Sequence, residues 1–111
     1  MKTIREFVPA DRYVYDFGPC SSKNGFAQID TKQDASYFGT WCSPSKRAVV
    51  SYCEGDVTTQ ICASDEEFVG LLREIARWND EQGHGPARID PGFAPELKEA
   101  FVAIGLGDML H

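Results

Sequence analysis

Residues 36–61 read SYFGTWCSPSKRAVVSYCEGDVTTQI, and this stretch decides the fold. It holds three runs rich in β-branched and aromatic residues, each bounded by turn-forming residues, which is a pattern typical of strands. The runs are so close together that hairpins must join them, and the sheet must therefore be antiparallel. A fourth strand-like run, Gly25–Asp30, precedes them, and the alternating run Arg12–Phe17 predicts a further short strand.

The turns predict which strand residues pair. Taking Gly55 as the first residue of a two-residue loop pairs Tyr52 with Thr59. The preceding loop pairs Trp41 with Ala48. We expect the face that results to be the core, because one buried face specifies the register strongly. Its members are Tyr37, Gly39, Trp41, Ala48, Val50, Tyr52, Val57, Thr59 and Ile61, joined by Ala27 and Ile29 from the first strand.

The opposite face of the sheet carries three of the four cysteines and is neither clearly polar nor clearly buried. We expect no helix on it, which makes it a candidate interaction surface. Its residues are Phe38, Thr40, Cys42, Val49, Ser51, Cys53 and Cys62. An apolar patch of this size needs a cover. The N-terminal segment, a second copy of the chain and another protein all remain open as that cover.

Two helices are predicted after the strands. Ser64 and Glu67 form a capping box at the start of the first helix. An apolar stripe at helical spacing follows, and the glycines and proline of residues 83–86 end the helix. Pro95 opens the second helix and Gly105 closes it. We expect helices over residues 65–82 and 94–104.

These elements predict one α+β domain spanning residues 1–111. Its antiparallel meander of four to five strands covers about residues 12–63, and the two C-terminal helices pack on one face of it. A chain of 111 residues is long enough to bury one core without disulfides or a metal.

The net charge of −6 lies entirely in the second half of the chain. Residues 1–63 hold seven acids and seven bases, whereas residues 64–111 hold ten acids and four bases. Such a surface attracts basic proteins and repels nucleic acid, so direct nucleic-acid binding is not expected. Acidic helices also simply keep small proteins in solution. The candidate acidic surface consists of Asp65, Glu66, Glu74, Glu81, Glu96 and Glu99.

No catalytic motif, metal-ligand spacing or cofactor motif is present in the sequence. The cysteines Cys20, Cys42, Cys53 and Cys62 form no C-x-x-C pair, and neither histidine lies near them in the chain. Cys62, two residues before the helix cap at Ser64, is the best placed for a lowered thiol pKa. No apolar run is long enough to span a membrane, and no secretory signal opens the chain, so we expect a cytoplasmic protein.

The run FAQIDTKQDASYFGTWCSPSKRAVVSYCEGD, followed by SDEEF and IDPGF, resembles short acidic proteins of proteobacterial chromosomes, plasmids and other mobile elements. That group has no established activity, so the resemblance implies no catalytic residue. It implies a mobile-element role, in which small acidic proteins block DNA-binding machinery by occupying basic channels. We therefore expect a non-enzymatic protein-binding module. More specifically, we expect an acidic inhibitor of a basic or nucleic-acid-binding partner. A small enzyme or redox-responsive protein using a cysteine is the alternative, and a homodimer is also open.

Overall fold

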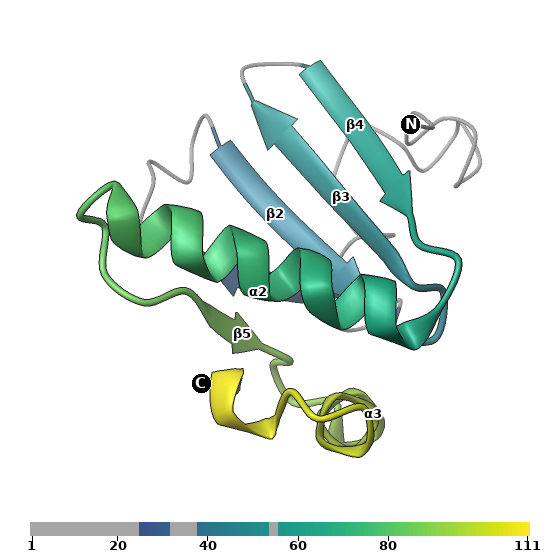
Figure 1. Cartoon of the computed structure of the whole chain (residues 1–111). Helices are drawn as coiled ribbons and strands as arrows, with labels where there is room; N and C mark the ends of the chain where they lie inside the picture. Colours follow the sequence, from purple (N-terminus) through teal and green to yellow (C-terminus); the bar gives the residue numbers. More distant parts are fainter. Residues whose placement is uncertain (1–24, 32–37, 54–55) are drawn as a thin grey trace.

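The computed structural model describes residues 25–31, 38–53 and 56–111, and it has the predicted α+β architecture (Figure 1). The strands are β1 (Ala27–Asp30), β2 (Phe38–Ser43), β3 (Ala48–Cys53), β4 (Asp56–Ile61) and β5 (Arg88–Asp90). The helices are α2 (Asp65–Glu81) and α3 (Pro95–Ala103), followed by the 3₁₀ turn η4 (Gly107–Met109). The sheet is antiparallel throughout, in the order β4-β3-β2-β1-β5. The predicted strand Arg12–Phe17 lies outside the described residues.

The fifth described strand was not predicted. Residues Arg88–Asp90, expected only to bridge the two helices, pair with β1 and extend the sheet beyond the meander. Ile89 is fully buried between two exposed charged neighbours. Three residues are too short to show a periodicity, so the local sequence gives no sign of this strand.

Both predicted hairpin registers differ from those in the structure by two residues. Tyr52 pairs with Val57 rather than Thr59. Trp41 pairs with Val50 rather than Ala48, because β2 continues to Ser43 before the chain turns. A shift of this size moves each partner by two residues along its strand. The residues predicted to share a face in β2, β3 and β4 therefore still share it.

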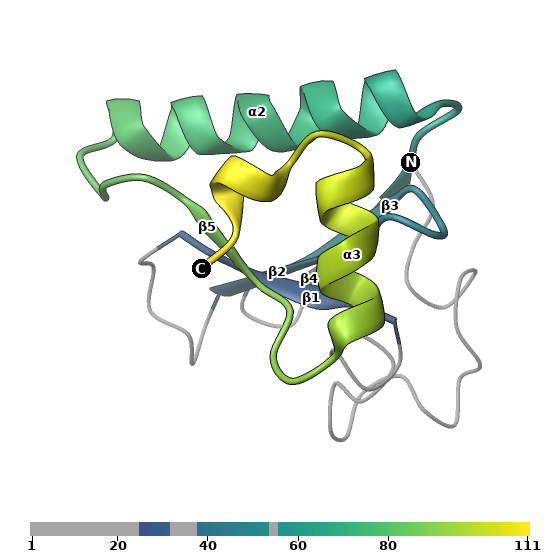
Figure 2. The same ribbon diagram turned by 90° about the horizontal axis from the view of Figure 1, so that it is seen from below.

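The prediction of which face the helices cover is wrong. Phe68 and Leu72 of α2 pack on the face of Cys42 and Val49, and Ala27 joins them there. Figure 2 shows α2 along one side of the sheet, with α3 running crosswise from that side past the level of the strands. Along the first strand the prediction placed Ala27 and Ile29 on the face of Gly39 and Trp41, whereas Ala27 pairs with Cys42 and Ile29 with Thr40. The register between β1 and β2 thus differs from the predicted one by an odd number of residues, which moves Ala27 and Ile29 to the opposite face.

The other face is also buried. Val50 and Thr59 lie on it and are 1% and 0% exposed, while Val49 on the helix side is 4% exposed. Val49 and Val50 therefore bury an apolar side chain on each face of β3, and the alternation of polar and apolar residues that normally identifies the core face is absent there. Hydropathy alone could not have chosen between the two faces.

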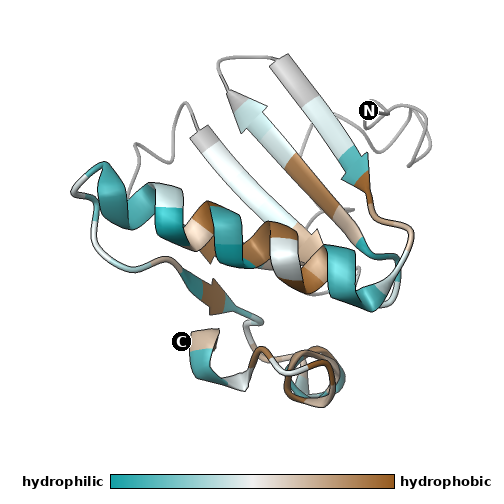
Figure 3. Cartoon of the chain, in the orientation of Figure 1, coloured by the Kyte–Doolittle hydropathy of each residue, from teal (hydrophilic) through white to brown (hydrophobic). Residues whose placement is uncertain are grey.

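The helices begin and end at the predicted signals. Ser64 is the N-cap of α2, and Gly83, just beyond its last turn, has a positive φ of 78°. Pro95 lies in the first turn of α3. Figure 3 shows hydrophilic and hydrophobic residues alternating along α2, as expected for a helix with one buried side. Leu106 and Met109 are buried in the core, so the residues after α3 pack onto it.

Replacing Phe68 with alanine tests which contact holds α2 on the sheet. Phe68 is fully buried in the core cluster, so the change should lower the free energy of unfolding by about 3–5 kcal/mol. Urea unfolding followed by circular dichroism measures this loss. Val102 on α3 is 55% exposed, and V102A should change stability by less than about 0.5 kcal/mol. Equal effects of the two substitutions would contradict the packing described here.

Candidate functional site

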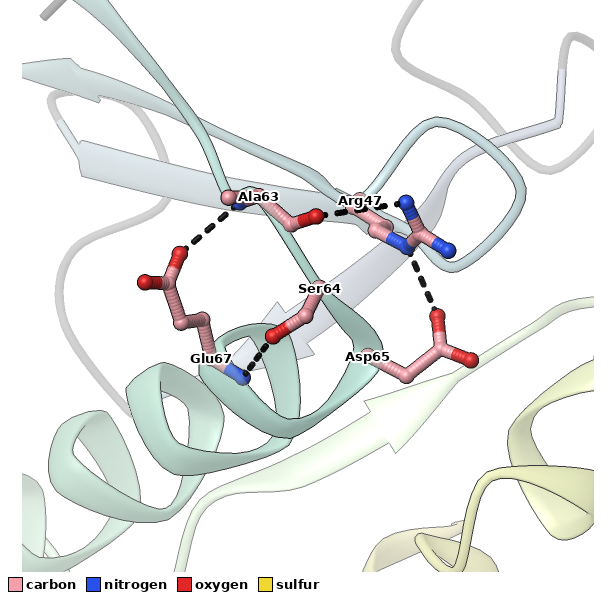
Figure 4. Close-up of polar contacts among 5 residues, drawn as sticks. All are labelled: Arg47, Ala63, Ser64, Asp65 and Glu67. Atoms are coloured by element: carbon pink, nitrogen blue, oxygen red, sulfur yellow. Dashed lines mark hydrogen bonds and ion pairs between the residues drawn. The ribbon is translucent and has the colours of Figure 1, made fainter.

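The start of α2 is tied to the residues before it by the predicted capping box (Figure 4). Ser64 Oγ accepts a hydrogen bond from the Glu67 backbone N–H at 3.2 Å. The Glu67 carboxylate reaches back and accepts one from the Ala63 N–H at 2.8 Å. The first bond satisfies an amide of the first turn that the helix itself leaves unpaired, and the second binds the Ala63 amide just before the cap. Together they hold the Glu67 carboxylate close to the end of β4.

Arg47 connects the β2–β3 turn to the same junction. Its guanidinium donates from Nε to Asp65 Oδ1 at 2.8 Å and from a terminal nitrogen to the Ala63 carbonyl at 3.5 Å (Figure 4). The backbone of Arg47 has a φ of 50°, which closes the turn, and its carbonyl accepts from the Cys62 N–H at 2.8 Å. Asp65 is therefore paired with a cation and contributes little to a free acidic surface.

A groove of about 390 Å³ opens between the end of β4 and the first half of α2. From the strand side it is lined by Gln60, Ile61 and Cys62, and from the helix side by Glu67, Gly70, Leu71 and Glu74. Two carboxylates and no cation line the groove. Ile61 is 41% exposed beside it, so apolar surface and negative charge meet at this place.

The glutamates of the groove belong to a longer row on α2. Glu67, Glu74 and Glu81 recur every seven residues, which is close to two helical turns, so they lie on one flank of the helix. We call these three residues the acidic row. All three are exposed, and Trp78, which is 45% exposed, follows Glu74 by one turn.

One of the two arginines on α2, Arg73, is bound to residues outside the helix. Arg73 donates to both carboxylate oxygens of Asp108, at 2.7 and 2.9 Å, and to the Gly105 carbonyl at 3.1 Å. Arg88 also donates to the backbone carbonyl of Asp108 at 3.1 Å. These contacts hold the η4 turn against α2. Of the two arginines on α2, only Arg77 is left with no ion pair to an acid within 4 Å among the described residues.

The predicted acidic surface is only partly assembled. Glu66, Glu74 and Glu81 are exposed on α2, but Asp65 is paired with Arg47. Glu96 and Glu99 are exposed on α3, where Glu96 lines a separate hollow with Pro44 and Ser45. Glu67 was predicted only as part of the helix cap, yet it is also an exposed acid of the surface. The seven-residue recurrence with Glu74 and Glu81 was the signal that could have identified it.

The predicted interaction surface on the sheet is not an open face. Thr40, Cys42 and Val49 are at most 4% exposed, and Cys62 is 8% exposed, since α2 covers this side. Ser51 is half-buried, and the side chains of Phe38 and Cys53 lie outside the described part of the chain. The prediction that this face is left uncovered is therefore wrong. Phe68 and Leu72 pack on it rather than on the opposite face, which carries Trp41.

The thiols of Cys42 and Cys62 are free and are held in the protonated form. Burial raises the pKa of Cys42 far above its ordinary value. The pKa of Cys62 is raised by burial and, to a smaller extent, by the negative charge of Glu67. The sequence predicted the opposite direction for Cys62 from its place before a helix. The capping carboxylate lies at that place and disfavours a thiolate, so neither thiol is suited to nucleophilic chemistry.

No metal centre or membrane span is found in the part of the chain that the structure describes. No group of three histidine, cysteine, aspartate or glutamate side chains there could hold a metal ion. None of its helices is both long and apolar enough to cross a bilayer. Comparisons with family models, curated proteins and solved structures give no match to this chain.

Replacing Glu67 with glutamine should make Cys62 more reactive. Glutamine keeps the capping box, but it removes the charge that helps to raise the Cys62 pKa, so the thiolate fraction at mildly alkaline pH increases. The rate of Cys62 alkylation, followed by peptide mass spectrometry, measures this. E66Q removes the same charge from the neighbouring residue and should leave the rate unchanged. An equal rise in both variants would show that Glu67 has no specific effect.

Replacing Asp108 with asparagine should remove a pH-dependent part of the stability. Hydrogen bonds from Arg73 lower the Asp108 pKa in the folded state. The resulting stability is present above the pKa of an unfolded aspartate and is lost as pH falls through the folded value. The wild type should therefore melt above D108N at neutral pH, and the gap should close in acid. D80N, which changes an exposed acid of α2, is the control. A gap independent of pH would contradict the ion pair.

Proposed function

We propose that this protein is a non-enzymatic binding module whose partner is a basic protein. The observation that supports this most is the acidic row beside the groove. Glu67 and Glu74 line a hollow without any cation, and Glu81 continues the row along the same flank of α2. The nearby arginines Arg47 and Arg73 are occupied by Asp65 and Asp108. Of the described residues, Arg77, between Glu74 and Glu81 in the helix, is the one cation close to the row that is not so occupied, and it does not line the groove.

Exposed apolar side chains next to the row favour binding over mere solubility. Trp78 is 45% exposed and follows Glu74 by one turn of α2, and Ile61, which is 41% exposed, is among the residues that line the groove. A helix that served only to keep the protein in solution would have no need to expose a tryptophan among its acids. Aromatic residues are enriched in protein interfaces, where a large apolar side chain supplies contact area and surrounding charges select the partner.

The narrower form of the proposal is an acidic inhibitor of a nucleic-acid-binding protein, with a role on a mobile element. Such partners carry basic surfaces that suit the row. Glu67 and Glu74 are about 10.5 Å apart along the helix axis, whereas duplex DNA carries a charge about every 1.7 Å of its axis. The row is therefore too sparse to imitate a nucleic acid over its length. It would inhibit by covering one basic patch, in competition with the nucleic acid.

Capture from a nuclease-treated extract of the native host tests the basic partner. The tagged protein should retain basic proteins at low salt and lose them at raised salt, because charge attraction is screened. The triple variant E67Q/E74Q/E81Q should lose most of this capture. The inhibitor form makes one more prediction. When the captured partner is purified and bound to a nucleic acid, adding the wild-type protein should displace that nucleic acid.

The matched control is E66Q/E96Q/E99Q, which removes the same three charges from the net −6 but leaves the acidic row intact. It should capture as the wild type does. If the two triple variants lose capture equally, only net charge matters and the row is not the site. If no basic protein is retained even at low salt, the proposed function is wrong.

A further inference from the structure

The groove beside α2 joins apolar surface to two carboxylates on one flank of the helix. Leu71 follows Glu67 by four residues and precedes Glu74 by three, and residues at these spacings are neighbours on a helix surface. The three side chains therefore form a line along the groove, with the apolar one in the middle. Ile61 lines the groove from the strand side and is 41% exposed, so both walls offer apolar surface.

Gly70 leaves room beside this line of side chains. A Cβ built at Gly70 has no heavy atom within 4 Å, so the space next to the helix backbone is open there. The groove has a volume of about 390 Å³, near the lower end of the range of roughly 300–1,000 Å³ for sites that hold small ligands. It therefore has room for one long side chain.

The Glu67 carboxylate is held in place before any ligand binds. One of its oxygens, Oε2, accepts the hydrogen bond from the Ala63 N–H at 2.8 Å, and an ionised carboxylate has further acceptor sites on both oxygens. Because the helix cap already orders this side chain, contact with a cation costs little additional side-chain entropy. Its charge acts inside the groove, since it helps to raise the pKa of Cys62, which also lines the groove.

The described cations near the groove do not neutralise its charge. Arg47 is paired with Asp65, and Arg73 with Asp108. Arg77 follows Glu74 by three residues, yet it forms no ion pair within 4 Å with any described acid and does not line the groove. A cation supplied from outside is therefore the electrostatic complement of this place.

The chemistry of the groove favours a long organic cation over a metal ion. Among the described residues, no group of three side chains could hold a metal, and an apolar wall offers no ligand to one. Lysine and arginine combine an alkyl stem, which lies along apolar surface, with a charged end. Either side chain matches walls formed by Leu71 and Ile61 together with the carboxylates of the groove.

The surroundings of the groove favour a side chain of a protein over a free amine. Glu81 continues the acidic row beyond the groove, and Trp78 is 45% exposed one turn after Glu74. A small amine inside the groove would leave both without contact, whereas a protein surface seated over the groove would cover them. A second copy of this chain is a poor source of the side chain, because each copy carries a net charge of −6.

We propose that a basic partner protein inserts one lysine or arginine side chain into the groove, with its alkyl stem on Leu71 and Ile61 and its charged end at Glu67 and Glu74. This inference rests on the proposed function and specifies the contact at its centre. A few side chains anchored in pockets carry most of the affinity of many protein interfaces. The carboxylates select the charge of the anchor, and the apolar walls select the length of its stem.

The probe for this proposal is a short capped peptide of glycine and serine with one central lysine. It is titrated into the full-length protein at low salt and followed by NMR, and the amide signals of Gly70 and Leu71 should shift as the groove fills. Norleucine at the central position keeps the stem without the charge, and diaminopropionic acid keeps the charge on a much shorter stem. Each of these peptides should bind about tenfold more weakly than the lysine peptide.

Substitutions in the protein test the groove itself. E67Q/E74Q should weaken binding of the lysine peptide about tenfold, because the groove loses its charge while glutamine keeps the helix cap. E66Q/E99Q removes two charges from exposed acids outside the groove and should bind as the wild type does.

G70L fills the groove from the helix side and should abolish binding. The Cβ at this position meets no atom, and leucine favours a helix more than glycine does, so the fold is kept. Circular dichroism and thermal melting of each variant show whether it is folded.

Two results would reduce the effect to charge attraction and overturn the anchor. One is equal binding of the lysine and diaminopropionic acid peptides, and the other is equal loss of binding in the two double variants. Tighter binding of butylamine, which is the lysine side chain as a free amine, would show a small-molecule site instead. A dimer mass by light scattering, with Gly70 and Leu71 signals that depend on protein concentration, would show a second copy in the groove.

Failure of the anchor is distinguishable from failure of the proposed function. Absence of peptide binding at low salt would overturn the anchor, while capture from the host extract decides the proposed function separately. Capture that needs the acidic row but survives G70L would keep a basic partner and reject its side chain in the groove.

Discussion

The packing of α2 on one face of the sheet is the contact on which the rest of the molecule depends. Phe68 and Leu72 are both fully buried against the strands, and the helix that carries them starts only three residues after β4 ends. Because this connection is so short, the first turn of α2 can lie in only a few positions relative to the end of β4. The bonds of Ser64 and Glu67 select one of them. The groove and the acidic row are consequences of that position.

The features that could be predicted from the sequence are those decided by nearby residues. The capping box at Ser64 and the glycine after α2 act within a few positions, so the helix bounds were correct to within a residue. The grouping of β2, β3 and β4 residues by face also held, because a hairpin shift of two positions preserves parity.

The features that failed depend on contacts between distant residues. Val49 and Val50 are both buried on opposite faces, so no local pattern shows which one meets the helix. β5 exists because β1 has a free side for it to pair with, and nothing in its three residues indicates this. The groove could not be predicted either. It brings Gln60 and Ile61 next to Glu74 across a turn of the chain, and the sequence indicated only that acids were abundant.

The covered edge at β5 limits where another molecule can join the sheet. A strand of another chain pairs only with an edge strand whose main-chain groups are free. Leu110 and His111 occupy the main chain of Ile89 on this edge. If they were displaced, β5 would become a place where a second molecule could pair. Leu110 and His111 thus keep this edge of the sheet closed to strands of other chains.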